Sequence, residues 1–537
     1  MAAPEVNYAD KSVLLVDSSG NMRSTIFYML RELRVQNLRA MTISDRVLDL
    51  IREESFDIIL LGHNSSDAVS GMQLLEEAHY RGYMRPTAGW IFMTSDASQE
   101  VVLHAIDSHP DDVLTKPFSI GRLKARLDLL VQRKRTLFAV EQAIEIGDLA
   151  AAVEACDDIS RSAPCYDQVQ RLRAQCLIDL GQPQEAYAGL ERQFWQQEDK
   201  DTGLLMAQAL YRLDRLAEAE EILSQLINHY PLLISAYDWL ARVYERNGRL
   251  HDAREALREA TLKAPLGIPR QMELGRVAVQ TEALEVAKGA YRRSIALGRH
   301  SCFRAPDPYL CLANVRRLEM KGADMRRLLE LREDIETLLN AVEFSFPRDP
   351  VLRVRTSLLR SQVAQDLAEP EEASRLIREA ESRNRTLAEP LDLEREERLL
   401  RGDRMPMLET SPSLLPRQES SPHAKRDQAM AAKVNRLGIK HYMAGKYSQA
   451  IRYFGLAVEY DPACPAALLN LAQLYLESAR DGSARRDERL KMVGRYLRLA
   501  ERLDLTAAER MRLNQFKELL KLPMEQLPAG ALSVLLR

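Results

Sequence analysis

Polar side chains stand at the ends of predicted strands between residues 12 and 132, where they could do chemistry together. The strands end at Asp17, Gly62, Thr94 and Lys116: a carboxylate, a position without a side chain, a hydroxyl and an ammonium group. In parallel sheets, functional groups lie at the carboxyl ends of the strands, so we expect these residues to share one edge. Asp17 is the only carboxylate among them, whereas Mg²⁺ needs several hard oxygen ligands, and a glycine cannot act as a nucleophile.

The elements that must position these residues alternate between short apolar runs and helical patterns. The apolar runs read SVLLV, LRAMT, DIILL, GWIFM and DDVLT. Five strands alternating with five helices predict an α/β domain whose five-stranded, doubly wound parallel sheet is covered on both faces.

The motif string resembles the receiver domain of bacterial two-component response regulators, which has a flavodoxin-like fold. The resemblance is carried by VLLVD, DIILL, the Thr that ends the fourth strand, and DDVLTKPF. It implies a phosphorylated carboxylate after the third strand, two acidic residues that hold Mg²⁺, and a hydroxyl and a lysine that bind the phosphoryl group. Carried over by position, Asp17 is the first acidic residue, Thr94 the hydroxyl and Lys116 the lysine.

The sequence departs from this family at two positions that phosphorylation needs. Gly62 stands five residues after Asp57, where the family has its phosphoacceptor carboxylate, and Ser18 stands at the second acidic position. We therefore expect no phosphorylation, no bound metal and no cofactor. Asp17 and Lys116 are interpreted as a residual ion pair that maintains the fold.

Two substitutes for the missing phosphoacceptor are left open. Asp67 could fold back toward the site, and His63 could take the position by a slip of one residue. Both are disfavoured because covalent chemistry needs close positioning of the nucleophile.

A second pattern, with a period near 34 residues, follows the α/β domain. Gly248, Ala253 and Pro265 recur with the same spacing as Gly445, Ala450 and Pro462, within helix–turn–helix units. This resembles the tetratricopeptide repeat, in which stacked helix pairs form an all-α solenoid. The resemblance implies a concave surface, lined by the first helix of each unit, that binds protein segments.

The patterns divide the chain into six parts. They are an N-terminal tail (1–11), a receiver (12–132), a tetratricopeptide array (133–301), a degenerate repeat-like helical region (302–401), a flexible linker (402–424) and a C-terminal repeat-like region (425–537). In the last part, Asn470 matches one residue of the family's carboxylate clamp, but Asn435 and Ile439 do not match the other two. No carboxylate clamp is therefore predicted.

The junction between receiver and array reads as one helix. Residues 119–146 contain no helix breaker after Gly121, and their apolar stripe continues throughout. The basic cluster Arg133 to Arg135 at this junction is interpreted as a solvated face and not as a nucleic-acid patch.

Composition excludes several classes of function. The net charge of −3, from 75 basic and 78 acidic side chains, gives no reason to expect a nucleic-acid partner. No apolar run is long enough for membrane insertion. Six scattered cysteines are expected to be reduced in a cytoplasmic protein. No catalytic motif is found, so we expect that the protein is not an enzyme.

These observations predict a non-enzymatic bacterial signalling adaptor. Its receiver is not phosphorylated, and its array binds another protein, such as a sensor kinase or another regulator, in the repeat groove. The alternative is a phosphorylation-switched response regulator with a repeat output. Whether the chain forms a homodimer is left open.

Overall fold

The computed structural model falls into two compact units, residues 1–418 and 419–537, each of which is described by itself. The described residues are 6–44, 46–65, 70–196, 198–387, 389–401, 428–461, 464–481, 486–501, 503, 505–522, 526–528 and 530–535. The predicted linker 402–424 and the candidate substitute Asp67 lie outside them.

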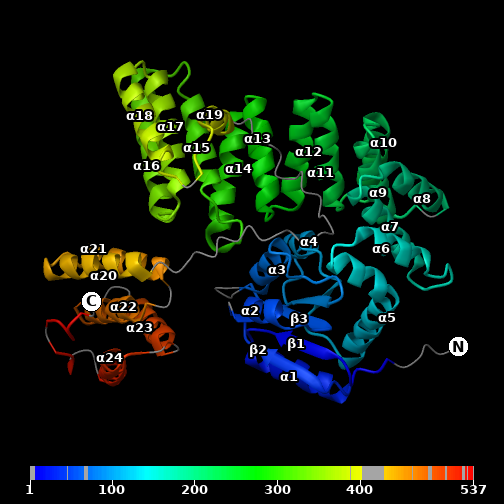
Figure 1. Cartoon of the computed structure of the whole chain (residues 1–537), viewed down its shortest axis with the longest axis horizontal. Coiled ribbons are helices and arrows are strands. Elements are labelled where there is room, and N and C mark those ends of the chain that lie inside the picture. The colour runs from blue at the N-terminus through cyan, green and yellow to red at the C-terminus, as the bar shows by residue number, and fades with distance from the viewer. Residues whose placement is uncertain are drawn as a thin grey trace. The chain divides into compact units, whose positions relative to one another are not determined.

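The first unit opens with a five-stranded, all-parallel sheet in the order β2-β1-β3-β4-β5 (Figure 1). The strands are β1 (Ser12–Val16), β2 (Asn37–Met41), β3 (Ile58–His63), β4 (Gly89–Thr94) and β5 (Asp112–Thr115). The helices between and after them are α1 (Gly20–Glu32), α2 (Arg46–Glu53), α3 (Gly71–Tyr80), α4 (Gln99–Asp107) and α5 (Ile120–Glu145). The predicted doubly wound sheet is confirmed.

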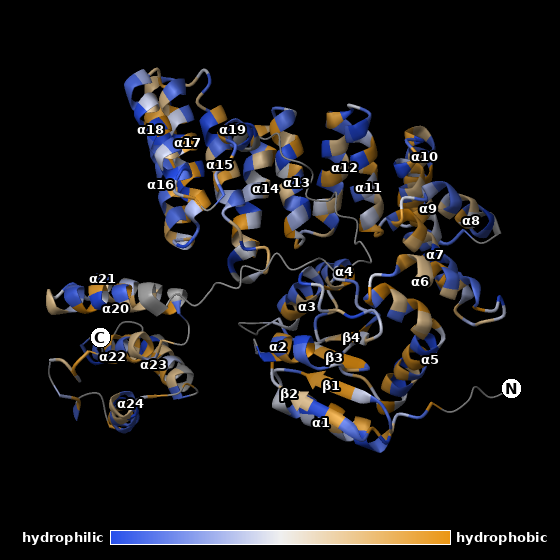
Figure 2. Cartoon of the chain, in the orientation of Figure 1, coloured by the Kyte–Doolittle hydropathy of each residue, from blue (hydrophilic) through white to orange (hydrophobic). Residues whose placement is uncertain are grey.

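Each face of the sheet has its own core, because successive strand residues point to opposite sides. Val13 and Leu15 of β1 pack with α1 and α5, whereas Leu14 and Val16 pack with α2 and α3. Figure 2 shows the central strands as apolar ribbons, as expected for a sheet covered on both faces. This alternation places Asp17 and Gly62 on the α1/α5 side.

Helix α5 is continuous over 26 residues, which confirms the predicted junction. Its first half covers the sheet, and its second half packs with α6 (Leu149–Asp157). The interpretation of the basic cluster as a solvated face is wrong for two of its three residues, whereas Arg135 is exposed. Arg133 and Lys134 are largely buried and both pair with Asp111, while Lys134 also contacts Glu141 at 3.0 Å. The cluster therefore fastens the helix to the loop before β5.

Antiparallel helix pairs follow α5. The pairs are α7 (Tyr166–Asp179) and α8 (Pro183–Gln196), α9 (Lys200–Arg212) and α10 (Leu216–His229), α11 (Ile234–Arg246) and α12 (Leu250–Lys263), and α13 (Ile268–Gln280) and α14 (Leu284–Leu297). The turn residue in the left-handed region is Gly248 in one pair, and Asp214 and Glu282 fill the same place in two others. Ala253 has no exposed surface, in line with a close helix contact at the repeat alanine.

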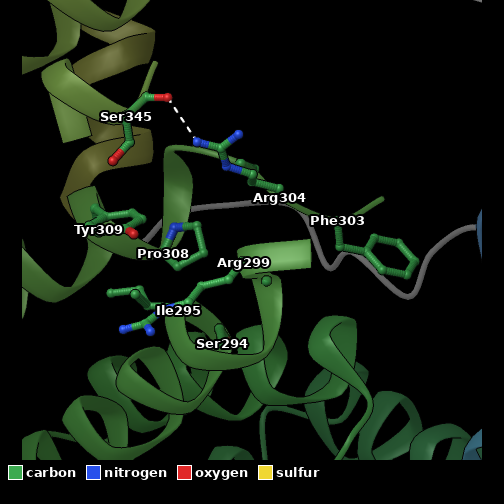
Figure 3. A pocket seen from close by; sticks show the side chains of 10 residues that line it. Ser294, Ile295, Arg299, Phe303, Arg304, Pro308, Tyr309 and Ser345 are labelled. Atoms are coloured by element: carbon green, nitrogen blue, oxygen red, sulfur yellow. Dashed lines mark hydrogen bonds between the residues drawn. The ribbon is translucent and has the colours of Figure 1, made fainter. Parts of the chain in front are cut away.

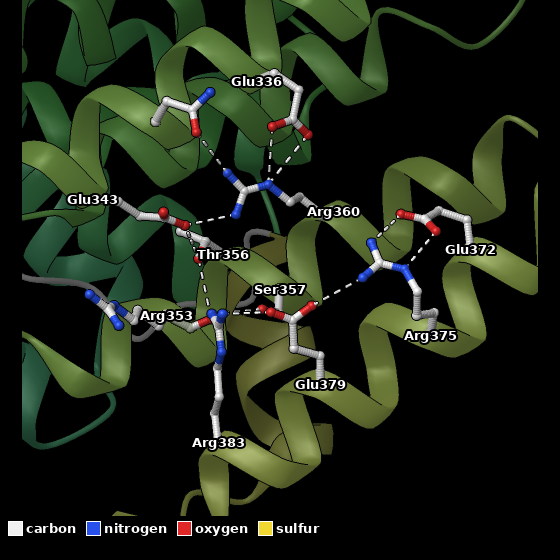
Figure 4. A network of polar contacts seen from close by, with 11 residues as sticks. Glu336, Glu343, Arg353, Thr356, Ser357, Arg360, Glu372, Arg375, Glu379 and Arg383 are labelled. Atoms are coloured by element: carbon white, nitrogen blue, oxygen red, sulfur yellow. Dashed lines mark hydrogen bonds and ion pairs between the residues drawn. The ribbon is translucent and has the colours of Figure 1, made fainter.

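The degenerate region keeps the pairing with longer helices. After the short 3₁₀ helix η1 (Gly298–His300) come α15 (Asp307–Leu318), α16 (Met325–Ser345), α17 (Pro350–Asp366), α18 (Pro370–Asn384) and α19 (Leu393–Arg401). Arg360 of α17 joins two carboxylates of α16, Glu336 at 3.1 Å and Glu343 at 2.7 Å (Figure 4). A half-buried ionic network therefore supplements the apolar core where the repeat pattern weakens.

The second unit contains α20 (Gln428–Met443), α21 (Tyr447–Tyr460), α22 (Pro465–Asp481), α23 (Arg486–Glu501) and α24 (Ala507–Leu519). Helices α20 and α21 form one pair and α22 and α23 another, and α24 packs against both α22 and α23. Gly438 of α20 lies so close to Phe454 of α21 that an added Cβ atom would come within 2.6 Å of the ring. The small residue thus lets the first pair close.

Candidate functional site

The strand-end residues of the receiver-like sheet form a closed, buried ion pair. Lys116 Nζ donates to Asp17 Oδ2 at 3.0 Å, and the side chains are 3% and 0% exposed. The other oxygen, Asp17 Oδ1, accepts from the backbone N–H of Ser19 at 2.9 Å. Both carboxylate oxygens are therefore engaged within the protein, with little solvent access.

Gly62 is essential to this arrangement, because its missing side chain leaves the space that Asp17 fills. A Cβ atom built on Gly62 would lie 2.1 Å from Asp17 Oδ2, far inside contact distance. On its other side, a Cβ atom on Gly71 would lie 2.0 Å from the carbonyl oxygen of Gly62. The third strand end is thus packed between a carboxylate and the start of α3, and no acceptor side chain fits there without rearrangement.

Asn64 completes the site, and sequence reasoning missed it. Its Oδ1 accepts from Lys116 Nζ at 3.2 Å, and its Nδ2 donates to Ser18 Oγ at 2.6 Å. Asn64 thus links the lysine to the residue at the lost acidic position. Its place two residues after Gly62 is the only signal in the sequence that could have indicated it.

Thr94 is also committed to local structure. Its Oγ1 donates to the carbonyl oxygen of Asp96 and accepts from the Asp96 N–H, each at 3.0 Å. Hydrogen bonds from Ser98 and Ser65 lower the pKa of the Asp96 carboxyl, which is partly exposed. The hydroxyl therefore holds the turn after β4.

His63 lies on the side of the sheet opposite to Asp17. Its ring stacks on Phe92, with 5.6 Å between the ring centroids, within the core that faces α2 and α3. The pleat accounts for this position, because neighbouring strand residues point to opposite faces. In this structure His63 does not occupy the acceptor position.

Comparisons with known proteins identify two kinds of domain in the chain. The model of the response regulator receiver domain matches residues 13–128, and tetratricopeptide repeat models match residues 204–268, 240–301 and 441–486. The chain joins a receiver domain to tetratricopeptide repeats. These parts indicate a role in signalling that involves protein–protein interaction.

Individual relatives resemble parts of the chain only. Chemotaxis protein CheY-3 of Vibrio cholerae serotype O1 is 23% identical over 121 residues, which are 22% of this chain and 92% of that protein. The structure of the BeF3-activated DrrB receiver domain is 24% identical, covers 23% of this chain and 98% of its own, and has a TM-score of 0.20. A tetratricopeptide repeat protein from Parabacteroides merdae is 14% identical, covers 50% and 98%, and has a TM-score of 0.31.

The receiver packs against the array through α4. Leu103 enters an apolar cluster at the ends of α11 and α12, and Gln99 donates to the carbonyl oxygen of Lys263 at 3.3 Å. Arg270 at the start of α13 is 7% exposed and pairs with Asp107 of the receiver at 3.1 Å. It also pairs with Asp238 of α11 at 2.8 Å, so a single guanidinium joins the receiver to two repeats.

Helix α3 adds a second contact beside the first. Glu76 accepts from Ser301 Oγ at 2.6 Å and lies 3.5 Å from His104 of α4. Tyr80 meets Phe303 edge to face, with 5.0 Å between ring centroids. Burial raises the pKa of Glu76. The receiver is thus fixed to the array by α3, α4 and α5, and no sequence pattern indicated the first two of these contacts.

The first helices of neighbouring repeats are joined along one side by charged side chains, and this side is here called the first-helix face. Arg276 of α13 is buried there and pairs with Glu245 of α11 at 2.7 Å and with the buried Glu273 at 3.0 Å. Arg242 of α11 lies over the ring of Trp239, 4.2 Å from its centroid, and burial lowers its pKa. A desolvated cation on an aromatic surface is a favourable contact point for an acidic or carbonyl group.

A small pocket near η1 offers no comparable chemistry. Its volume is about 230 Å³, below the usual range for small-molecule sites, and it lies between the end of α14 and the start of α15 (Figure 3). Arg304 at its rim donates to the carbonyl oxygen of Ser345 at 3.1 Å and stacks on Phe346. Among the described residues, no group of His, Cys, Asp or Glu could hold a metal ion. No helix within the residues that the structure describes is long and apolar enough to cross a membrane.

Proposed function

We propose that the protein is a non-enzymatic signalling adaptor whose receiver works as a fixed structural module. The observation that carries the proposal is the packing of the Asp17 carboxylate into the space above Gly62. Phosphorylation of a receiver needs a carboxylate that can reach the donor, with Mg²⁺ to neutralise charge. Here one carboxylate is tied to Lys116 and the acceptor position has no side chain.

The contacts between receiver and array support the same proposal. A switching receiver needs surfaces that can change between two arrangements. In this protein Arg270, Leu103 and Glu76 lie in buried contacts that join α3 and α4 to the array. A partner that binds the receiver therefore also encounters the repeats in a set orientation, which suits an adaptor.

The proposed partner of the array is a protein segment held on the first-helix face, in a sensor kinase or another regulator. Arg242 stacked on Trp239 is the feature best suited to anchor it, because stacked arginines are frequent anchors of protein interfaces. A glutamate in place of Arg242 should repel an acidic segment that the native guanidinium attracts.

Thermal unfolding with and without Mg²⁺ tests the receiver part of the proposal. A chain that binds no Mg²⁺ gains no stability from it, so millimolar Mg²⁺ should leave the melting temperature unchanged. A clear increase that disappears in the Asp17→Ala variant would overturn the proposal, because it would show an active metal site.

Retention of a partner tests the array part. Partner proteins retained by the wild-type chain should be lost from the Arg242→Glu variant. The matched control is Arg258→Glu, on the exposed surface of α12, which should retain them. Equal retention by both variants would show that the first-helix face is not the binding surface.

A further inference from the structure

The C-terminal segment of the chain lies across its own repeat-like unit as a peptide ligand would. Residues 526–528 and 530–535 contact one side of α20, α22 and α24, the first helices of that unit together with its terminal helix. The contacted surface, here called the tail site, is formed by Tyr442, Gln473, Glu477, Arg480 and Gln515 together with the apolar side chains around them.

The tail site holds the segment mainly by its backbone. Gln473 Nε2 donates to the carbonyl oxygen of Ser533 at 2.8 Å, and Glu477 Oε1 accepts from the N–H of Leu532 at 2.8 Å. Gln515 Nε2 donates to the carbonyl oxygen of Leu532 at 3.1 Å. Backbone recognition does not depend on the side chains of the bound segment, so a different extended peptide could make the same bonds.

Arg480 extends this recognition to the first half of the segment. Its Nη1 donates to the carbonyl oxygens of Pro528 and Gly530, the second at 2.8 Å. Gly530 has a φ of +82°, a conformation that other residues rarely adopt, so the segment turns at this point. After this turn, Leu535 joins a cluster that includes Ile439 and Tyr442 of α20.

Three leucines of the segment provide the specificity that backbone bonds lack. Leu527 and Leu532 enter the core formed by α22, α23 and α24, and Leu535 enters the cluster around Phe454. They are 7%, 6% and 9% exposed. Full burial of a leucine side chain contributes about 1.5–3 kcal/mol, so these three side chains dominate the binding.

The polar floor of the tail site is already ordered for this purpose. Asn470 donates to Asn435 at 2.9 Å and accepts from Arg512 Nη1 at 2.8 Å, and Arg512 also donates to Gln473. Burial lowers the pKa of Arg512 to about 10. The chain of bonds fixes Gln473, which then has one N–H left for a bound backbone carbonyl.

The geometry points to a peptide site that the protein closes with its own C-terminus. We infer that its external partner is an extended segment of another protein with leucines spaced as Leu527, Leu532 and Leu535, which must displace the tail. The inference deepens the proposed adaptor function, on which the existence of such a partner rests. The contacts that hold the tail in this site involve no residue of the receiver. A failed test of the receiver proposal would therefore leave this inference unaffected.

Binding of a labelled synthetic peptide with the sequence of residues 526–537 to the full-length chain tests the inference. The wild-type chain should bind the peptide weakly, because the tethered tail competes at an effective concentration on the order of millimolar. A full-length variant with Leu532→Asp and Leu535→Asp should release its tail and bind the peptide at least about tenfold more tightly. The unit should remain folded in this variant without its tail, so hydrogen exchange in α22 should stay slow.

A third substitution tests whether the peptide binds at the tail site and not elsewhere on the unit. Adding Gln515→Ala to the released-tail variant should weaken peptide binding, because Gln515 donates to Leu532. Adding Lys517→Ala instead should not, because Lys517 pairs with Glu501 of α23 and is not one of the residues that form the tail site.

Three results would overturn the inference. One is equal, weak binding by the wild-type and released-tail chains. Another is loss of protection throughout α20–α24 in the released-tail variant, which would make the tail a structural element of the unit. The third is a wild-type dimer whose tails are exchanged between copies, which would make a second copy the occupant.

Discussion

Replacement of Gly62 by alanine is the sharpest single perturbation of the strand-end site. The added Cβ atom would lie 2.1 Å from Asp17 Oδ2 and 2.6 Å from Asp17 Cγ. The obstructing carboxylate is buried and paired with Lys116 at 3.0 Å, so it cannot move into solvent at low cost. We therefore expect Gly62→Ala to destabilise the receiver.

The size of the effect follows from two limits. Overpacking a core by one methyl group costs about 1–3 kcal/mol when neighbours can shift. Separating a buried ion pair costs about 3–5 kcal/mol, which applies if Asp17 is driven away from Lys116. Alanine also loses less backbone entropy than glycine, which offsets about 0.5–1 kcal/mol. A loss of about 2–4 kcal/mol is expected.

Hydrogen exchange in peptides from β1 and β3 measures this loss as a change in the free energy of local opening. The matched control is Gly121→Ala in α5, where the added atom would lie 3.9 Å from Ser119 Oγ and should be neutral or mildly stabilising. In an Asp17→Ala background the cost of Gly62→Ala should shrink by at least about 1 kcal/mol, since the obstructing carboxylate is gone. Wild-type exchange rates in the single variant Gly62→Ala would refute the reasoning.

Three further predictions concern the contacts between receiver and array. Burial raises the pKa of Glu141 from its ordinary 4.5 to about 7, so the folded state holds a proton that the unfolded state releases, and stability should fall as the pH rises from about 4.5 to about 7. Glu141→Gln should remove this pH dependence, which amounts to up to about 3 kcal/mol in the free energy of unfolding. Urea unfolding at several pH values measures it. Arg270→Met should leave the partly buried carboxylates of Asp107 and Asp238 unpaired, at a cost on the order of 3 kcal/mol at most, and speed hydrogen exchange in α4. A Gly-Pro pair at Arg133-Lys134 should break α5, and solution scattering should then show a broader spread of shapes.

Each of these predictions has a result that contradicts it. An unchanged pH profile in Glu141→Gln would mean that this carboxyl does not hold a proton in the folded chain. Unchanged exchange in α4 of Arg270→Met, with Arg258→Met as the exposed control, would mean that the receiver does not depend on this contact. A wild-type chain that already scatters as broadly as the Gly-Pro variant would mean that α5 is not a rigid link.

Much of the fold could be predicted because local patterns determine it. Strands buried on both faces read as apolar runs, and the linking helix from Ile120 to Glu145 follows from an unbroken apolar stripe. The repeat turns were readable because one position needs a left-handed residue, which is glycine at Gly248 and Gly445. These signals lie within a few residues of each other.

The remainder of the site depends on contacts between distant residues. Asn64 reaches Lys116 across the sheet, and Arg270 meets Asp107 across the boundary between receiver and array. No local periodicity marks such pairs. The basic cluster at Arg133 was misread for the same reason, because its partner Asp111 belongs to a different element. The close approach of Asp17 to Gly62 likewise required the register of β1 against β3.

Intact-mass spectrometry after incubation with acetyl phosphate and Mg²⁺ tests the central claim most directly. The account predicts that the full-length chain keeps its unmodified mass, because Gly62 offers no acceptor and Asp17 is held by Lys116. A stoichiometric gain of one phosphoryl group, located on a carboxylate of residues 12–132, would contradict it.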